Sequence, residues 1–338
     1  TWLVARAAPA PLHEPPVYAG EFERRWGIGS FSQLVRGVAP TAALHSLLHT
    51  PRPGDDERAL EGSDPLPTLS PPGTPLFATS AAAPPWHRFP RGAVVGNFLH
   101  DQLEWLAGED FALGNASADA GSAVFSTEGG GGLDTSAAEP AQHNLLAERL
   151  RQRCERAGHA NHADTVLQWL GTVVRTPLPG VGAALQGLDT VLPEMEFWLP
   201  AGRLAATEVD ALCCQHLLDG QPRAALPERA LHGMLMGFAD LVFEHGGRYW
   251  VLDYKSNHLG ADAGAYHGDA LIAAMAAHRY DVQAALYLLA LHRLLRQRLG
   301  DGYNPAQQLG GALYLFLRGV DAPGQGVYTV PPSLPLLD

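Results

Sequence analysis

The spacing of apolar residues predicts a chain in which helices and strands follow one another. Helices are predicted where hydrophobic side chains recur every three to four positions, near residues 92–106, 143–157, 162–175, 207–219 and 278–299. Short apolar runs predict strands at 192–199 and 311–317. Ser30, a good N-cap residue, is expected to start a short helix, and the tail from Pro323 is expected to be irregular. This mixture indicates an α/β protein.

Residues 237–255 have the pattern of a β-hairpin. Two runs rich in β-forming residues flank the dipeptide Gly246-Gly247, which suits the positive φ angles of a tight turn. With the turn centred there, His245 pairs with Arg248. Continuing this register along the two strands places residue 240 opposite residue 253, with Cβ atoms about 5 Å apart.

Both of these opposed residues are acidic, and the only lysine of the chain lies close by. Asp240 faces Asp253, and Lys255 lies two positions further on the same strand, so its side chain shares a face with Asp253. Facing carboxylates repel unless positive charge lies between them, and a divalent cation with oxygen ligands suits that place. A lysine amine can also shift its pKa far enough to lose its charge, whereas a guanidinium stays charged. The alternatives are a solvated hairpin without a function and a simple Asp–Lys ion pair.

Three further positions carry polar groups that could join this hairpin. Gly96 and His100 are one helical turn apart, so the glycine would let a ligand or another backbone come close to the histidine. Taken alone, His100 also fits an ordinary surface or capping histidine. Glu196 is a possible acidic ligand on the strand 192–199, or simply an exposed acid. Gln283 and Tyr287 share one face of the helix 278–299.

Composition divides the chain into three predicted parts. Residues 1–50 are predicted to be a connector, because residues 1–26 are rich in proline and aromatic in places. Residues 51–90 are dominated by Pro, Gly, Ala, Ser and acidic residues, as in a flexible linker. The regular hydrophobic pattern then resumes, so residues 91–338 are predicted to form the folded domain.

The charge and cysteine content narrow the functional classes. A net charge of −12 argues against sequence-independent nucleic-acid binding through a broad basic surface. The three cysteines show neither a disulfide framework nor a metal-binding spacing. Neither a signal peptide nor a membrane-spanning segment is apparent, so a cytoplasmic location is expected.

Taken together, the candidate residues resemble the core of the PD-(D/E)XK nucleases. Asp240 followed by Asp253-Tyr254-Lys255 matches the core motif, and the flanking patterns Gly96-x-x-x-His100 and Gln283-x-x-x-Tyr287 resemble its RecB-type subgroup. The resemblance implies a central mixed sheet flanked by helices, with added N-terminal helices. A phosphate loop of the type Gly-x-x-x-x-Gly-Lys cannot occur, because its lysine is missing. Residues 1–50 would then connect to a helicase region that this sequence lacks.

The resemblance also implies roles for these residues. A divalent metal, Mg²⁺ above all, with Mn²⁺ or Ca²⁺ able to substitute for binding, would be held by His100, Asp240, Asp253 and the backbone carbonyl of Tyr254. The catalytic residues would be Asp240, Asp253 and Lys255, with Lys255 orienting the attacking water and offsetting charge on the phosphoryl oxygens. Glu196, Gln283 and Tyr287 would have secondary roles at the site.

The implied activity is metal-dependent cleavage of single DNA strands during double-strand-break repair and recombination. The implied partners are DNA, the RecC and RecD subunits and the RecA recombinase, with no membrane. One alternative is an interaction module that docks partner subunits or RecA and has little activity in isolation. Another is a stand-alone exonuclease of the same superfamily.

Overall fold

The computed structural model describes residues 26–38, 84–113, 138–320 and 324–337. Its centre is a six-stranded mixed sheet in the order β1-β3-β4-β5-β6, with β2 paired to β3. The pairs β1–β3 and β4–β5 are parallel, and the other pairs are antiparallel. The strands are β1 (Gly27–Gly29), β2 (Thr190–Ala205), β3 (Ala230–His245), β4 (Arg248–Lys255), β5 (Leu309–Phe316) and β6 (Val327–Val330). The predicted α/β fold with a central mixed sheet is confirmed.

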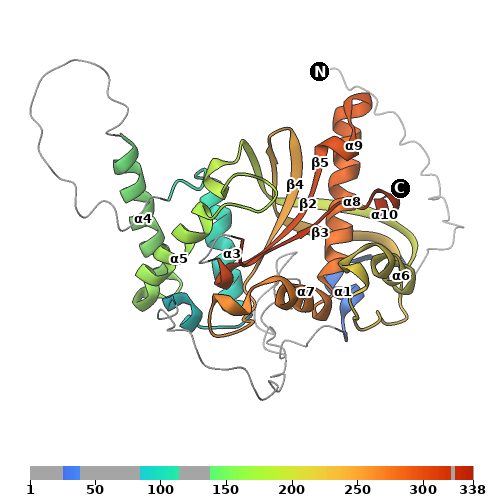
Figure 1. Ribbon diagram of the computed structural model, residues 1–338, viewed down its shortest axis with the longest axis horizontal. Helices are drawn as coiled ribbons and strands as arrows, with labels where there is room; N and C mark the ends of the chain where they lie inside the picture. Colours follow the sequence, from blue (N-terminus) through green and yellow to red (C-terminus); the bar gives the residue numbers. More distant parts are fainter. Residues whose placement is uncertain (1–25, 39–83, 114–137, 321–323, 338) are drawn as a thin grey trace, which may run out of the picture.

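Helices cover both faces of the sheet, with α3, α4 and α5 on one side and α1, α6, α7 and α8 on the other (Figure 1). Each side has its own hydrophobic core, called here the α3 core and the α8 core. Among the described residues, no helix is both long and apolar enough to cross a membrane. The helices are α1 (Phe31–Val35), α3 (Ala93–Ala107), α4 (Ala138–Arg156), α5 (Ala163–Arg175), α6 (Ala206–His216), α7 (Gly268–Ala277), α8 (Tyr280–Leu299), α9 (Pro305–Gln308) and α10 (Leu334–Leu337).

The predicted hairpin is present in the predicted register. His245 pairs with Arg248, and the pairing continues to Leu241 with Leu252. Gly246 and Gly247, the two turn residues, both have positive φ angles, which only glycine adopts at no steric cost. From β4 the chain crosses over through α7 and α8 to β5, as a parallel neighbour requires.

The predicted helix 278–299 is confirmed as α8, which begins at Tyr280. Arg279, with a φ of 57°, separates it from α7, a helix that was not predicted. One expectation about secondary structure was wrong. The predicted irregular tail contains β6, which pairs with β5, and α10. The Ser30 cap is confirmed, since the serine side chain accepts a hydrogen bond from the backbone N–H of Gln33.

One edge of β3 is shared by two different strands. β4 pairs with residues 241–245 and β1 with residues 233–235. Among the described residues, the short stretch of this edge between them has no strand partner. Gly233 has a φ of +135°, and a Cβ there would lie 2.0 Å from the carbonyl oxygen of Gly27. Glycine is therefore required for β1 to lie against β3.

The predicted division into connector, linker and folded domain remains a prediction, and residues 51–83 lie outside the described part. Within the predicted connector, residues 27–29 form β1, and Phe31, Leu34 and Val35 are buried in the α8 core. Near the end of the predicted linker, Trp86 and Phe89 are buried in the α3 core.

Candidate active site at a fork between two strands

The site lies where β3 and β4 part. Their ladder stops one pair before Asp240 and Asp253, so the direct pairing expected from the register is absent from it. Instead, Asp240 Oδ2 accepts a hydrogen bond of 2.8 Å from the backbone N–H of Tyr254. The hydrogen bond uses the backbone N–H of Tyr254, a donor on β4 next to the fork. It keeps the Asp240 carboxylate close to the point where the two strands separate. Repulsion between two facing carboxylates favours such a separation of the strands.

A distortion in β2 and β3 turns Asp240 toward α3. Glu194, which lies opposite Asp240 on β2, has a φ of 47°. The Glu194–Asp240 pair is missing from the β2–β3 ladder, although the register before and after it is the same. Ala239 and Val242 both lie in the α8 core, although three positions apart, so the strict alternation of faces is broken between them. Leu241 is in the α3 core, and its neighbour Asp240 contacts a residue of α3. Irregularities of this kind are a common way of re-aiming a side chain next to a functional site.

His100 reaches Asp240 from α3. Its Nδ1 lies 3.2 Å from Asp240 Oδ2, and the histidine is only 2% exposed, so it is not a surface histidine. One turn earlier, a Cβ on Gly96 would lie 2.9 Å from the hydroxyl oxygen of Ser256. The close approach expected from the Gly96 and His100 spacing is therefore present, and it brings α3 against the end of β4.

The ring of Tyr254 packs against His100. Its ring meets the imidazole edge-on, with centroids 5.9 Å apart and an interplanar angle of 86°. Burial, together with the negative charges of Asp240 and Asp253, raises the pKa of the Tyr254 phenol well above its usual value. The phenol therefore stays neutral at physiological pH and adds no negative charge beside the two carboxylates.

Asp253 and Lys255 form a buried ion pair on the opposite side, toward α8. Lys255 Nζ is 2.5 Å from Asp253 Oδ2, and the two residues are 0% and 3% exposed. The Asp–Lys ion pair considered from the sequence is thus present, and the shared face of the two residues is confirmed. Lys255 Nζ also lies 4.0 Å from the ring centroid of Tyr280 and 5.5 Å from that of Tyr314.

Gln283 and Tyr287 complete this side of the fork. The Tyr287 hydroxyl lies 2.9 Å from Asp253 Oδ1 and 2.8 Å from the carbonyl oxygen of Phe238, and it accepts a hydrogen bond of 2.9 Å from Gln283 Nε2. Phe238 lies in the stretch of β3 between the partners β4 and β1. The Tyr287 hydroxyl is therefore in hydrogen-bonding distance of both the β3 backbone and Asp253, and its single proton can be donated to either acceptor.

The start of α8 is fixed by a buried network of two arginines and two aspartates, which was not predicted from the sequence. Arg279 Nη2 is 2.6 Å from Asp210 Oδ1, Arg279 Nε is 3.1 Å from Asp281 Oδ1, and Arg223 Nη1 is 3.0 Å from Asp281 Oδ2. Burial alone would lower the pKa of Arg279, but hydrogen bonds and charges from Asp281 and Asp210 outweigh it and raise the pKa. The network anchors the helix that carries Tyr280, Gln283 and Tyr287.

Glu196 lies apart from these residues. It is exposed, and its carboxylate accepts a hydrogen bond of 2.9 Å from Trp198 Nε1. Among the described residues it forms no hydrogen bond or ion pair with another predicted site residue. Its neighbours Met195 and Phe197 lie in the α8 core, so Glu196 points to the α3 face of the sheet, the face that also carries His100. Its outer role stays a prediction.

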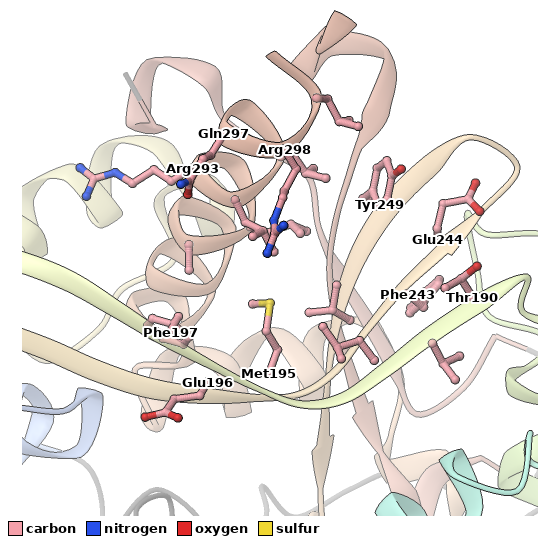
Figure 2. A pocket seen from close by; sticks show the side chains of 18 of the residues that line it. Thr190, Met195, Glu196, Phe197, Phe243, Glu244, Tyr249, Arg293, Gln297 and Arg298 are labelled. Atoms are coloured by element: carbon pink, nitrogen blue, oxygen red, sulfur yellow. The ribbon is translucent and has the colours of Figure 1, made fainter.

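A pocket of about 580 Å³ lies between β2, β3 and the C-terminal half of α8. Its walls are mostly apolar, and Figure 2 shows Met195 and Arg298 extending into it from opposite sides. Glu196 borders this pocket but points away from it (Figure 2). Asp240, Asp253, Lys255 and His100 do not line it, so the pocket is separate from the strand fork.

The donor groups at the fork suit a hard divalent cation. Two carboxylates and one imidazole are appropriate ligands for Mg²⁺ or Mn²⁺, and a charge of +2 would balance the two aspartates. Within the described residues, no three His, Cys, Asp or Glu side chains lie close enough together to bind a metal ion. The reason is visible in the contacts: Asp240 is held by His100 and the Tyr254 N–H, whereas Asp253 is held by Lys255 and Tyr287.

Residues 80–331, which include every predicted site residue, match the PD-(D/E)XK nuclease superfamily. The chain belongs to this superfamily. Members use divalent metal ions, which fits the donor groups at the fork. The RecB-type resemblance is confirmed by curated relatives named as the RecB subunit of the RecBCD enzyme.

Three of these relatives show how much of the nuclease is shared. The chain is 41% identical over 259 residues to RecB of Escherichia coli K12, which is 74% of this chain and 19% of the relative. It is 36% identical over 181 residues to RecB of Haemophilus influenzae, 52% of this chain and 14% of the relative. With RecB of Mycobacterium tuberculosis H37Rv the identity is 30% over 345 residues, 93% of this chain and 27% of the relative. The nuclease thus spans only a minor part of each relative.

Proposed function

We propose that this chain is a Mg²⁺-dependent deoxyribonuclease that hydrolyses phosphodiester bonds in single strands of DNA during double-strand-break repair and recombination. The observation that carries the proposal is the Lys255–Asp253 pair, with Nζ 2.5 Å from Oδ2, beside the fork where His100 contacts Asp240. A buried ammonium against one carboxylate, at the same fork as a carboxylate–imidazole pair, is suited to phosphoryl chemistry, because it combines candidate cation ligands with a positive group.

Each residue of the fork has a proposed role. Asp240, Asp253, His100 and the Tyr254 carbonyl would hold the cation, and Mn²⁺ or Ca²⁺ could take its place in binding. When bound, the cation makes a water molecule more acidic and neutralises charge on the phosphate. Lys255 orients the attacking water and offsets the charge that develops on the phosphoryl oxygens.

The residues around these ligands keep them in position. Tyr287, with Gln283 behind it, fixes the Asp253 carboxylate through the hydroxyl contact of 2.9 Å. Glu196, on the face that also carries His100, would act outside the ligand set. These contacts pre-organise the site before DNA arrives, which is where most of the benefit of a fixed active site lies.

The proposed partners follow from the relatives, which are named as subunits of the RecBCD enzyme. We propose RecC and RecD as partner subunits, RecA as a further partner, and DNA entering the site as a single strand. Cys154, Cys213 and Cys214 are all free, which suits the reducing cytoplasm proposed as its location.

The test is cleavage of end-labelled single-stranded DNA by the wild-type chain and by Lys255→Ala. We expect cleavage with Mg²⁺, none with EDTA, and a loss of at least about 100-fold in Lys255→Ala, the scale seen when a charge-stabilising group is removed from an active site. Asp189→Asn is the matched control. It removes an exposed carboxylate that contacts His245 far from the fork, and it should retain full activity. Undiminished cleavage by Lys255→Ala would contradict the catalytic role of Lys255.

Metal binding is measured separately by calorimetry with Mn²⁺. Asp253→Ala and Asp240→Ala should each lose binding, whereas Asp189→Asn should bind as the wild type does. Unchanged binding in Asp253→Ala would refute the proposed ligands. Metal binding without any cleavage by the wild-type chain would instead favour the interaction-module alternative.

A further inference from the structure

We propose that Tyr280 is a positioning residue whose ring holds the Lys255 ammonium in place for catalysis. The inference rests on the proposed nuclease function, because it assigns a purpose to the surroundings of the catalytic lysine. Tyr280 is not part of the predicted nuclease motif. It precedes Gln283 by three positions on α8.

The contact between the two residues has the geometry of a cation–π interaction. Lys255 Nζ lies 4.0 Å from the centroid of the Tyr280 ring, within the distance of about 6 Å at which such contacts are effective. The strength of a cation–π contact rises when water is excluded, and both residues are almost completely buried, at 0% and 1% exposure. Tyr280 is therefore well placed to stabilise the ammonium on its buried side, against α8.

The Tyr280 ring is itself fixed by its neighbours. It stacks on His278 at 5.1 Å and 11° and on Tyr314 at 5.7 Å and 18°. Its hydroxyl donates a hydrogen bond of 3.2 Å to Asn257 Oδ1, and its backbone carbonyl accepts one of 3.1 Å from the Tyr314 hydroxyl. A ring held from several directions gives a fixed surface rather than an adaptable one.

A fixed surface matters because a lysine side chain is long and flexible. Asp253 Oδ2 and the Tyr280 ring contact the same nitrogen, so together they define both the direction and the reach of the ammonium. With the carboxylate alone, the four-carbon side chain could turn while keeping its ion pair. The aromatic contact removes this freedom, so the ammonium faces the fork in one orientation.

Kinetics can separate this role from simple core packing. Tyr280→Leu should lower kcat about tenfold, which corresponds to about 1.4 kcal/mol and is within the range of a buried cation–π contact, with KM changed less than about twofold. Tyr280→Phe keeps the ring and should restore kcat to within about twofold of the wild type. In a Lys255→Ala background, Tyr280→Leu should cause no further loss. An equal loss in Phe and Leu, or an undiminished loss in that background, would overturn the proposal.

A second readout is independent of activity, because the chain contains a single lysine. Labelling with ¹³C-lysine gives one set of side-chain signals, and the ring current of Tyr280 should displace the Lys255 ε-methylene protons upfield. We expect the displacement to persist in Tyr280→Phe and to fall by more than about half in Tyr280→Leu, where only the more distant Tyr314 ring, 5.5 Å from the nitrogen, remains. An unchanged signal in Tyr280→Leu would show that the ring does not hold the lysine, whether or not the chain cleaves DNA.

Phe243→Leu is the matched control for both measurements. Phe243 is as buried as Tyr280, but it lies in the α3 core and stacks on Trp250. Its replacement should lower stability without moving the lysine signal and without lowering kcat. If this variant moved either quantity as much as Tyr280→Leu does, the effect of Tyr280 would be one of general packing and the proposal would fail.

Discussion

Replacing Tyr287 with phenylalanine would test whether the fork depends on one hydroxyl. The substitution keeps the ring in the core and removes only the oxygen that contacts Asp253, Gln283 and the Phe238 carbonyl. No other residue changes, so any effect reports on these three polar contacts.

The expected loss of stability can be worked out from the contacts. The hydroxyl has one proton, so it donates to the Phe238 carbonyl or to Asp253, and it accepts from Gln283. Losing a bond to a charged group costs about 1.5–3 kcal/mol, and a buried polar group left without a partner costs about 1–3 kcal/mol. Because the groups share one proton, these values overlap, and we expect a net destabilisation of about 2–3 kcal/mol.

Urea denaturation followed by circular dichroism measures this loss. For a chain with a denaturant slope of about 3 kcal/mol per M, the midpoint should fall by about 0.7–1 M. The control is Tyr303→Phe, whose hydroxyl contacts His292 Nδ1 at 3.1 Å in a half-exposed place, and whose loss should stay below about 1 kcal/mol. If the free energy of unfolding of Tyr287→Phe lay within about 0.5 kcal/mol of the wild-type value, the contacts of the Tyr287 hydroxyl would not stabilise the β3 edge.

Two further predictions concern charge. Arg279→Leu removes a cation from the buried Asp281 and from Asp210, and urea denaturation should show a loss of about 3–5 kcal/mol; a loss below 1 kcal/mol would contradict the anchoring role. Burial raises the pKa of the Cys154 thiol to about 11 from 9.0, so the unfolded chain ionises first as pH rises. The stability that Cys154 adds relative to Cys154→Ala is thus present below pH 9 and should fall by about 2–3 kcal/mol between pH 9 and 11.

The parts of the site that follow from local spacing could be predicted from the sequence. The Gly246-Gly247 turn determines the register of the hairpin, and the two-residue period of a strand places Lys255 on the face of Asp253. Helical spacing likewise identifies α3, which carries His100. These relations depend only on neighbours in the chain.

The parts that depend on tertiary contacts could not be predicted. The register gives no sign of where β3 and β4 separate, because the end of the ladder depends on α3 and α8 pulling Asp240 and Asp253 apart. β6 is only four residues long and exists because β5 offers an edge. The left-handed conformation of Arg279 is stabilised by Asp210, which is distant in the sequence, and by Asp281 at the start of α8. The residues next to Arg279 therefore do not predict it.

The pairing of β1 with β3 has a consequence for the order in which the chain can fold during synthesis. Gly27 leaves the ribosome long before Gly233, its partner, exists. The β3–β4 hairpin closes a short loop and can form as soon as it emerges, whereas β1 must close a loop of most of the chain. We therefore expect β1 to dock last. Until then, Phe31, Leu34 and Val35 have no core to enter, and a nascent chain stalled before residue 230 would keep these apolar side chains available to chaperones.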